Sequence, residues 1–187
     1  MILNVTLPHQ PLPDAYFDLR YDVLRKPLGA PLGSERLTDD PYAIHAWLED
    51  EGRIISVGRV HKLDDCDDGS AYDDKAQSSC PAFEPLTKTY RQHMLDDRGR
   101  MIAHHIRPAC QFRQMGTDPE YRGKGYGAKI LMALELAAMD HWNVESGWLQ
   151  ARIAALPFYS KNGWAGFGKP YDVPNVGPHR SMWKMFG

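Results

Sequence analysis

The stretch from Cys110 to Asp140 constrains this chain most, because it predicts a strand, a glycine-rich turn and a long helix in direct succession. The run from Cys110 to Thr117 is short and extended. The pair Asp118-Pro119 ends it, because proline lacks a backbone N–H and disfavours the helical conformation in the residue before it. Three glycines then alternate with other residues, and apolar side chains recur at helical spacing beyond them. The turn therefore joins a strand directly to an amphipathic helix.

A turn of this kind is suited to bind an anion. Glycines allow backbone amides to converge, and the start of a helix adds unpaired N–H groups and the positive end of the helix dipole. We therefore expect a phosphate or pyrophosphate here. A P-loop is excluded because no Ser or Thr follows a Gly-Lys pair, and a dinucleotide fingerprint fits poorly because the third glycine comes one residue early. The remaining pattern, Arg/Gln-x-x-Gly-x-Gly/Ala, fits Arg122 to Gly127 at every fixed position.

Two further segments accompany this loop. Gln150-Ala151-Arg152 is followed by Phe158-Tyr159 and then Gly163-Trp164, and the segment from Gly177 to Met182 comes near the end. In order and separation the three segments resemble the GCN5-related N-acetyltransferase (GNAT) family, in the branch of small bacterial members. The resemblance implies an α/β (α+β) fold with a mixed, mostly antiparallel central sheet of about seven strands and helices on both faces. It implies a single domain over residues 1–187.

Hydrophobic periodicity and turn residues predict the elements of this sheet. We expect strands over residues 2–7, 42–48, 53–62, 110–117, 147–151, 164–171 and 180–186, and helices over 14–24, 126–140 and 154–162. In the first helix Asp14 is the expected N-cap. Its expected apolar face is formed by Phe17, Tyr21 and Leu24, and Arg20 is expected among the basic residues of a solvated helix end.

A long insertion separates the third and fourth strands. Roughly 45 residues, about 63–108, intervene where ordinary connections are much shorter. The insertion is acidic near its start, but as a calcium loop it would have Cys66 at the third ligand position and Lys75 at the twelfth. We therefore expect a solvated acidic loop, which could attract a cationic substrate. Because His104 and His105 are adjacent on an extended segment, they point to opposite faces and cannot share a metal; no metal site is expected.

Composition excludes several classes of function. A chain of 187 residues, 43% of them hydrophobic, suits one domain with its own core. The net charge of −2 gives no basic field for nucleic acid, and no apolar run approaches the roughly 18 residues of a membrane span. Three cysteines without paired spacing, Cys66, Cys80 and Cys110, predict a reducing, cytoplasmic location.

The family resemblance implies an enzyme that transfers the acetyl group of acetyl-CoA to a primary amine, by direct attack in a ternary complex. The amine would belong to a small molecule, a peptide or a protein. The end of the fourth strand would lie beside the pantetheine arm and present an amide to the thioester oxygen, and the loop amides would hold the pyrophosphate. The residues expected to bind acetyl-CoA are Met115, Gly116, Thr117, Arg122, Gly123, Lys124, Gly125, Tyr126, Gly127, Ala128, Gln150 and Phe158.

The same resemblance suggests the catalytic residues. Tyr159 matches the family's tyrosine near the CoA sulfur and is the expected proton donor to the leaving thiolate, although a buried tyrosine can equally be a core residue with a satisfied hydroxyl. The base stays open between His179, one of His104 and His105, and an ordered water. His179 has a suitable ordinary pKa. Cys110 is expected to be buried packing, since direct attack needs no nucleophilic cysteine.

Other assignments stay open at this point. Gln150 replaces the family's usual Asn, which together with the insertion leaves room for a non-catalytic acyl-CoA-binding or regulatory domain. A nucleotide-binding Rossmann protein is a third reading. In the resembling proteins the first-helix region walls the acceptor site, which makes Arg25 and Glu35 candidate contacts. The resemblance also implies a homodimer, and the sequence does not identify the acceptor.

Overall fold

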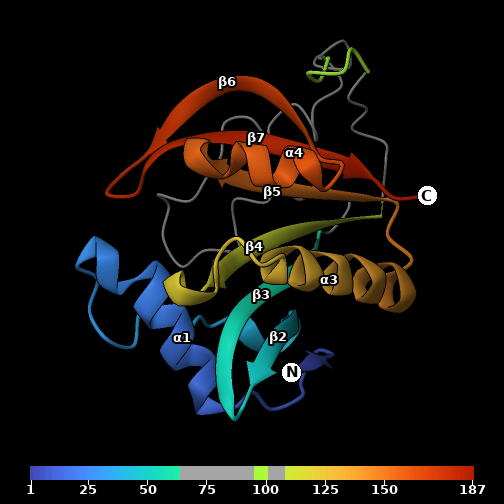
Figure 1. Ribbon diagram of the computed structural model, residues 1–187. Helices are drawn as coiled ribbons and strands as arrows, with labels where there is room; N and C mark the ends of the chain where they lie inside the picture. Colours follow the sequence, from blue (N-terminus) through green and yellow to red (C-terminus); the bar gives the residue numbers. More distant parts are fainter. Residues whose placement is uncertain (64–94, 101–107) are drawn as a thin grey trace. The chain divides into compact units, whose positions relative to one another are not determined.

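The structure is a computed structural model that describes residues 1–63, 95–100 and 108–187 (Figure 1). The expected strands and helices are all found. The strands are β1 (Ile2–Thr6), β2 (Ile44–Asp50), β3 (Arg53–Leu63), β4 (Ala109–Thr117), β5 (Ser146–Arg152), β6 (Ala165–Val173) and β7 (Gly177–Met185). The α-helices are α1 (Asp14–Leu24), α3 (Tyr126–Trp142) and α4 (Leu156–Lys161). Residues 64–94 and 101–107 of the insertion are not described, so His104, His105, Cys66, Cys80 and the acidic segment lie outside the described residues.

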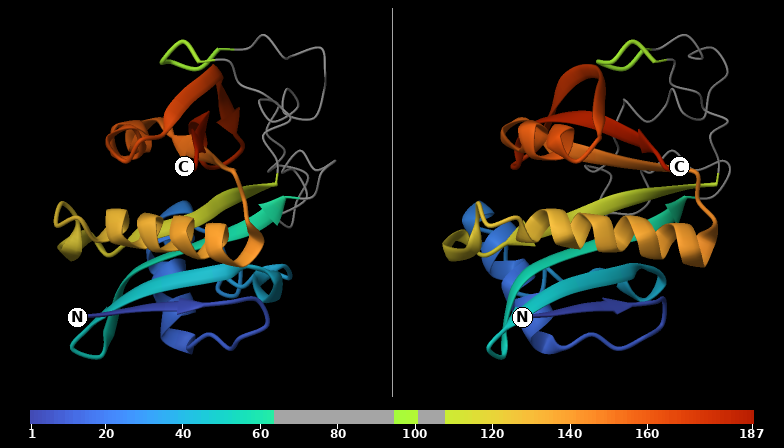
Figure 2. Two further views of the ribbon diagram at one scale, coloured as in Figure 1. Left: turned by 90° about the vertical axis from the view of Figure 1, so that its right-hand side faces the viewer. Right: turned by 45° about the vertical axis from the view of Figure 1, so that its right-hand side comes forward.

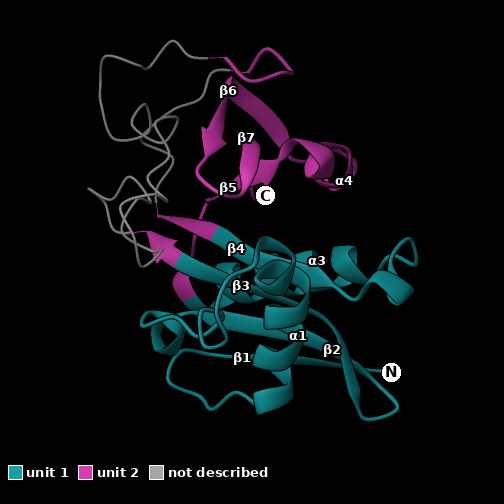
Figure 3. Cartoon of the chain, turned by 90° about the vertical axis from the view of Figure 1, so that its left-hand side faces the viewer, with its two compact units in different colours: residues 1–61, 112–141 teal, residues 62–111, 142–187 magenta. Residues whose placement is uncertain are grey.

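The described strands form one seven-stranded sheet in the order β1-β2-β3-β4-β5-β7-β6. The pairs β1·β2, β2·β3, β5·β7 and β6·β7 are antiparallel. By its contacts the chain divides into two compact units, shown in Figure 3. Unit 1 comprises residues 1–61 and 112–141, and unit 2 comprises residues 62–111 and 142–187.

In unit 1 two helices cover opposite faces of β2 and β3, as Figure 2 shows. Side chains of α1 pack with Trp47 and Val57 in one buried cluster. On the other face lies Gly58, where an added Cβ would come within 2.9 Å of Ile130 Cγ2 and 3.1 Å of Leu134 Cδ1, both on α3. Side chains alternate along a strand, so Val57 and Gly58 point to opposite faces. The mixed apolar pattern of β3 predicts this double coverage, and eight consecutive residues of the strand are buried.

The first helix differs from its predicted form in two respects. It begins at Asp14, but Pro13 occupies the N-cap position and no side chain caps the helix; Asp14 instead pairs with Arg36. The buried face is also displaced along the helix: Phe17 is buried as predicted, while Tyr21 and Leu24 are only partly buried. The weak amphipathic pattern of this segment did not fix which side of the helix meets the sheet.

Arg20 is not at a solvated helix end but completely buried. Its Nη1 donates to Asp40 Oδ1 at 2.9 Å, and the buried Arg59 of β3 bonds the same carboxylate and that of Asp39. Burial alone would raise the pKa of Asp40, but the two guanidinium groups outweigh it and hold the pKa below its ordinary value. This network ties α1 to β3 through the turn before β2. Removing one partner of such a buried pair typically costs about 3–5 kcal/mol.

Unit 2 is built around aromatic side chains of its three paired strands. The indole rings of Trp148 and Trp183 stack with centroids 5.3 Å apart, and Phe167 meets Trp148 edge-on. Cys110 is buried and its thiol lies 3.6 Å from the carbonyl oxygen of Ser146, which agrees with its expected packing role. Residues 95–100 of the insertion also belong to this unit, and Asp96 forms a β-bridge with Phe167 at the outer side of β6.

Candidate functional site

The glycine-rich loop of unit 1 holds a run of amides with no acceptor. Gly123 and Gly125 have φ of 76° and 83°, in the left-handed region that glycine adopts readily. The amide of Lys129 is the first to donate into the helix, to Gly125 O at 3.1 Å. In the part of the chain that the structure describes, none of the amides from Gly123 to Ala128 donates a hydrogen bond. Unpaired amides at a helix start favour an anion, as the motif predicts.

The basic side chains of this loop have other contacts. Arg122 Nε donates to the carbonyl oxygen of Thr117 at 3.1 Å, which folds the side chain back onto the end of β4. Lys124 Nζ lies 4.9 Å from the ring centroid of Tyr121. Both residues are exposed. These two side chains therefore add positive charge to the loop, whereas its backbone amides are the unpaired hydrogen-bond donors.

The strand that leads into the loop is irregular at Gln114. Its φ of 54° lies in the left-handed region, which is unusual for a residue with a side chain and typical of a β-bulge. The residues that directly follow Gln114 are Met115, Gly116 and Thr117, the three that were expected beside the pantetheine arm. Glutamine has no preference for this conformation, so no signal in the sequence marks it.

Close contacts around the end of β4 explain a glycine in that strand and another in β3. An added Cβ on Gly116 would lie 2.5 Å from Val23 Cγ2 of α1, and one on Gly58 would lie 2.4 Å from Met115 Sδ. Each glycine therefore permits a close approach on one face of the sheet. The structure brings α1, β3 and the end of β4 together, with the loop following directly in the chain.

The carbonyl groups of this strand end are partly engaged, which the resemblance did not anticipate. Ser56 Oγ donates to Gly116 O at 3.2 Å and lies 2.8 Å from Thr117 Oγ1. Arg122 Nε donates to the Thr117 carbonyl, so side chains contact both carbonyl groups at this strand end. Ser56 was missed from the sequence, where its one signal is a hydroxyl within an apolar strand.

Unit 2 carries the expected proton donor. Tyr159 is buried on the short helix α4, with its ring edge-on to Phe158 at 4.9 Å and to Trp164 at 6.2 Å between centroids. Burial raises the pKa of Tyr159 well above its ordinary value, so the phenol keeps its proton at neutral pH. Among the described residues its hydroxyl has no hydrogen-bond partner. A core tyrosine would normally have one.

His179 is the described candidate for the base. Its Nδ1 lies 2.7 Å from the carbonyl oxygen of Gly177. A carbonyl only accepts, so Nδ1 carries the hydrogen and Nε2 keeps the lone pair. Burial, with a smaller contribution from Arg152, lowers the pKa of His179 and keeps the ring neutral at pH 7. No hydrogen bond joins His179 to Tyr159 in the described chain. Gln150 faces Ser181 in the β5–β7 register and is partly buried.

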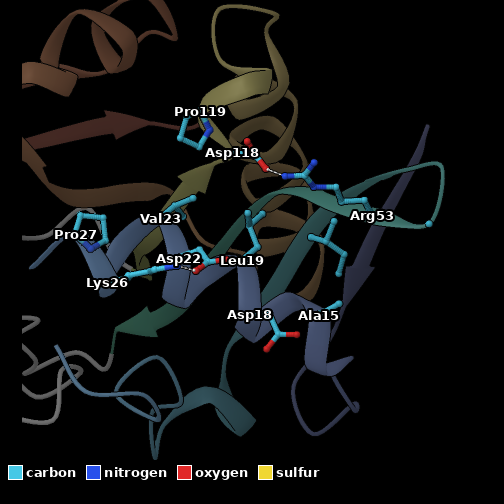
Figure 4. A pocket seen from close by; sticks show the side chains of 12 residues that line it. Ala15, Asp18, Leu19, Asp22, Val23, Lys26, Pro27, Arg53, Asp118 and Pro119 are labelled. Carbon is cyan, nitrogen blue, oxygen red and sulfur yellow. Dashed lines mark hydrogen bonds and ion pairs between the residues drawn. The ribbon is translucent and has the colours of Figure 1, made fainter. Parts of the chain in front are cut away.

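A hollow of about 650 Å³ lies beside the β4 end in unit 1 (Figure 4). It is bounded by α1, by the start of β3 and by the Asp118-Pro119 pair. Leu19, Val23 and Ile54 give it an apolar lining. Asp118 and Pro119 directly follow β4 in the chain, so the hollow borders the segment between that strand and the loop.

The rim of this hollow is charged. Asp22 pairs with Lys26 at 3.1 Å, and Arg53 pairs with Asp118 at 2.5 Å. Asp18 is exposed and has no ion-pair partner among the described residues. Of the two acceptor contacts suggested by the resemblance, Glu35 is buried and accepts from its own loop at Gly33 N, which makes it structural.

The described residues contain no group of three or more His, Cys, Asp or Glu that could hold a metal ion. Among the described helices, none combines the length and apolar character needed to cross a bilayer.

Comparison with known proteins gives consistent results. Residues 91–165 match the family described as "Acetyltransferase (GNAT) domain". The uncharacterized N-acetyltransferase YitI of Bacillus subtilis is 32% identical over 76 residues, which is 41% of this chain and 50% of the relative. The match thus spans about half the length of that curated relative.

Solved structures share the fold over nearly the whole chain. Escherichia coli ElaA aligns with a TM-score of 0.64 at 14% identity, covering 98% of this chain and 99% of that one. An aminoglycoside 6'-N-acetyltransferase in complex with coenzyme A aligns with a TM-score of 0.60 at 13% identity, covering 99% and 97%. At such identities the likeness shows the fold, and it confirms the predicted mostly antiparallel GNAT-like sheet with its helices.

Proposed function

We propose that this chain, whose residues 91–165 match the acetyltransferase (GNAT) domain family, transfers an acetyl group from acetyl-CoA to a primary amine. The observation that carries the proposal is the unpaired run of amides from Gly123 to Ala128 at the start of α3. A diphosphate needs several donors converging on one place, and this loop offers them with two basic side chains beside it. The residues present therefore fit coenzyme A.

The reaction forms an N–C amide bond, breaks the C–S thioester bond and moves one proton from the amine to the departing thiolate. An ordinary primary amine has a pKa near 10 and is mostly protonated at neutral pH, so a base must accept a proton before attack. We assign this part to Nε2 of His179, because Gly177 O fixes the hydrogen on Nδ1. His104 and His105 lie outside the described residues and keep their place as candidates.

We propose that the hydroxyl of Tyr159 donates a hydrogen bond to the departing sulfur. Its hydroxyl has no partner in the described chain, and its raised pKa keeps the proton on oxygen while charge develops on sulfur. A hydrogen bond that forms only as the thiolate leaves stabilises the transition state more than the bound substrate. Gln150 and Phe158 are proposed to line the same part of the site from β5 and α4, as the family resemblance implies.

We propose the hollow beside Gly116 as the route of the amine. Its apolar lining suits a carbon chain, and Asp18 supplies a carboxylate that has no ion-pair partner among the described residues. A cationic amine is therefore the class of acceptor that the described residues favour. We place the protein in the cytoplasm, as its three cysteines without paired spacing suggest.

The proposal is tested in two steps on the full chain. Isothermal titration with acetyl-CoA should show saturable binding, with NAD much weaker. Thiol release from acetyl-CoA should then be measured over a panel of polyamines, amino sugars, amino acids and peptides. Binding with thiol release for at least one amine is the expected result. Binding without release for any amine would favour a regulatory acyl-CoA-binding domain instead.

A further inference from the structure

Among the described residues, the strand β1 presents an uncovered edge on unit 1. It pairs with β2 on one side, from Ile2 opposite Glu49 to Thr6 opposite His45, and no described strand lies on its other side. Its burial pattern is mostly exposed, and the relative exposures of Ile2, Leu3 and Val5 are 59%, 47% and 40%. Outward-facing N–H and C=O groups on such an edge are a template for another strand.

Proteins usually protect an exposed edge with lysine, proline, a bulge or a covering segment. The strand Ile2–Thr6 contains no charged residue and no proline, and its register with β2 is regular from Ile2 to Thr6. Exposed apolar side chains lie on both of its faces: Leu3 and Val5 share one, and Ile2 lies on the other. The partner that such an edge fits is therefore an uncharged, apolar strand.

The opposite edge strand of the sheet, β6, is covered by residues of the insertion. On β6 the insertion supplies a covering segment, with Asp96 bridged to Phe167 and the Asp97 amide bonded to Gly166 O at 2.9 Å. An added Cβ on Gly166 would come within 2.6 Å of Asp97 Oδ2, so the cover is closely fitted. Within the described chain, one edge strand is covered and the other is open.

We propose that β1 is the contact surface with a second copy of this chain, paired antiparallel with its counterpart about a two-fold axis. Two identical apolar strands satisfy each other's backbone groups in this arrangement, and the interface closes after two copies. Charge also favours antiparallel over parallel pairing. The acidic turn of Glu49, Asp50 and Glu51 lies at the Ile2 end of the edge. Antiparallel pairing places the two acidic turns at opposite ends of the interface, whereas parallel pairing would bring them together.

Sedimentation velocity of the full chain over a range of concentrations tests this surface. We expect a dimer, and Val5→Lys, which adds a charge to the edge, should weaken dimerisation at least about tenfold. Leu32→Lys is the matched control, because it removes another exposed apolar side chain away from β1 and should leave the dimer intact. Circular dichroism and urea unfolding would establish that both variants are folded.

Hydrogen exchange of the wild-type chain gives a second measurement that needs no variant. Amides of residues 2–6 should become more protected as the protein concentration rises through the dimerisation range. A monomer at all concentrations would overturn the proposal. So would a dimer that Val5→Lys does not weaken, or one that forms without added protection of residues 2–6.

Discussion

The carboxylate of Asp96 accepts a hydrogen bond from the indole N–H of Trp183 at 2.9 Å, joining the insertion to the last strand of the chain. The same carboxylate accepts from the Arg98 and Arg100 amides at 2.8 and 2.9 Å. Burial alone would raise the pKa of Asp96, but these hydrogen bonds outweigh it and hold the pKa below its ordinary value. Asp96 thus fixes residues 95–100 to the core of unit 2.

Replacing Asp96 should therefore be costly. Asp96→Ala leaves a buried indole N–H and two loop amides without their acceptor, so we expect the free energy of unfolding to fall by about 2–4 kcal/mol. Urea unfolding followed by tryptophan fluorescence measures this. Asp97→Ala is the control, because Asp97 is half exposed in its ion pair with Arg180 and its loss should cost under about 1 kcal/mol. Equal losses for the two variants would contradict the anchoring role.

Acid should weaken unit 1 through His45. Its Nε2 donates to Asp40 O at 2.8 Å, and its Nδ1 lies 3.0 Å from Tyr16 Oη. Burial lowers the pKa of His45 from 6.5 to about 4. Between pH 6.5 and pH 4 His45 is protonated in the unfolded chain but neutral in the folded chain. The free energy of unfolding therefore falls as the pH drops from 6.5 towards 4.

The size of this loss follows from the shift in pKa. It corresponds to about 3 kcal/mol at pH 4 and is absent above pH 6.5. Urea midpoints of wild type and His45→Gln, measured from pH 4 to 7, isolate the contribution from that of other groups. The variant is expected to lose less stability than wild type over this window, and parallel pH curves would show that His45 does not cause the loss.

Gly125→Val should lower the affinity for acetyl-CoA at least about tenfold. At a φ of 83° a β-branched side chain is strained, and relief of that strain turns the loop amides away from one another. Gly33→Val is a matched control, since Gly33 has a φ of 95° in a different loop and neither added Cβ meets an atom within 4 Å. Calorimetry of both variants separates loop geometry from general strain. Unchanged affinity in Gly125→Val would remove the loop from the site.

Tyr159→Phe should reduce turnover at least about tenfold while leaving acetyl-CoA affinity almost unchanged. The physical reason is that, in the proposed mechanism, the hydroxyl stabilises the departing sulfur and not the bound ground state. Tyr171→Phe, whose hydroxyl lies 3.3 Å from Ser181 Oγ, is the control for loss of a phenol in the same unit. Thiol release and calorimetry provide the two readouts. A normal rate for Tyr159→Phe would exclude Tyr159 from catalysis.

Asp18→Asn should raise the KM for cationic amines by roughly twofold to fivefold, the range expected for one exposed charge. Acetyl-CoA affinity should stay the same, and added salt should reduce the difference between variant and wild type. Asp140→Asn, an exposed carboxylate near the end of α3, serves as the control. If both variants behave alike, the hollow beside α1 is not the amine route.

Much of unit 1 could be predicted from local patterns. The glycine alternation at 123, 125 and 127 predicts the loop, and the periodicity after it predicts α3, because both are set by neighbours within a few residues. The β2–β3 hairpin followed in the same way from a turn between two apolar runs. The left-handed conformation of Gln114 could not be predicted, because glutamine does not favour a positive φ.

The sequence by itself therefore determined the order of elements, the glycine-rich loop before α3 and the family resemblance, since each depends on residues close together in the chain. Tertiary structure alone decided that Arg20 is buried against Asp40, that Asp96 meets Trp183 and that Ser56 bonds the end of β4. These partners are 20, 87 and 60 residues apart. The sequence does not show whether a polar side chain forms its hydrogen bonds with water or with a residue far away in the chain. Only the folded chain brings that distant residue within hydrogen-bonding distance.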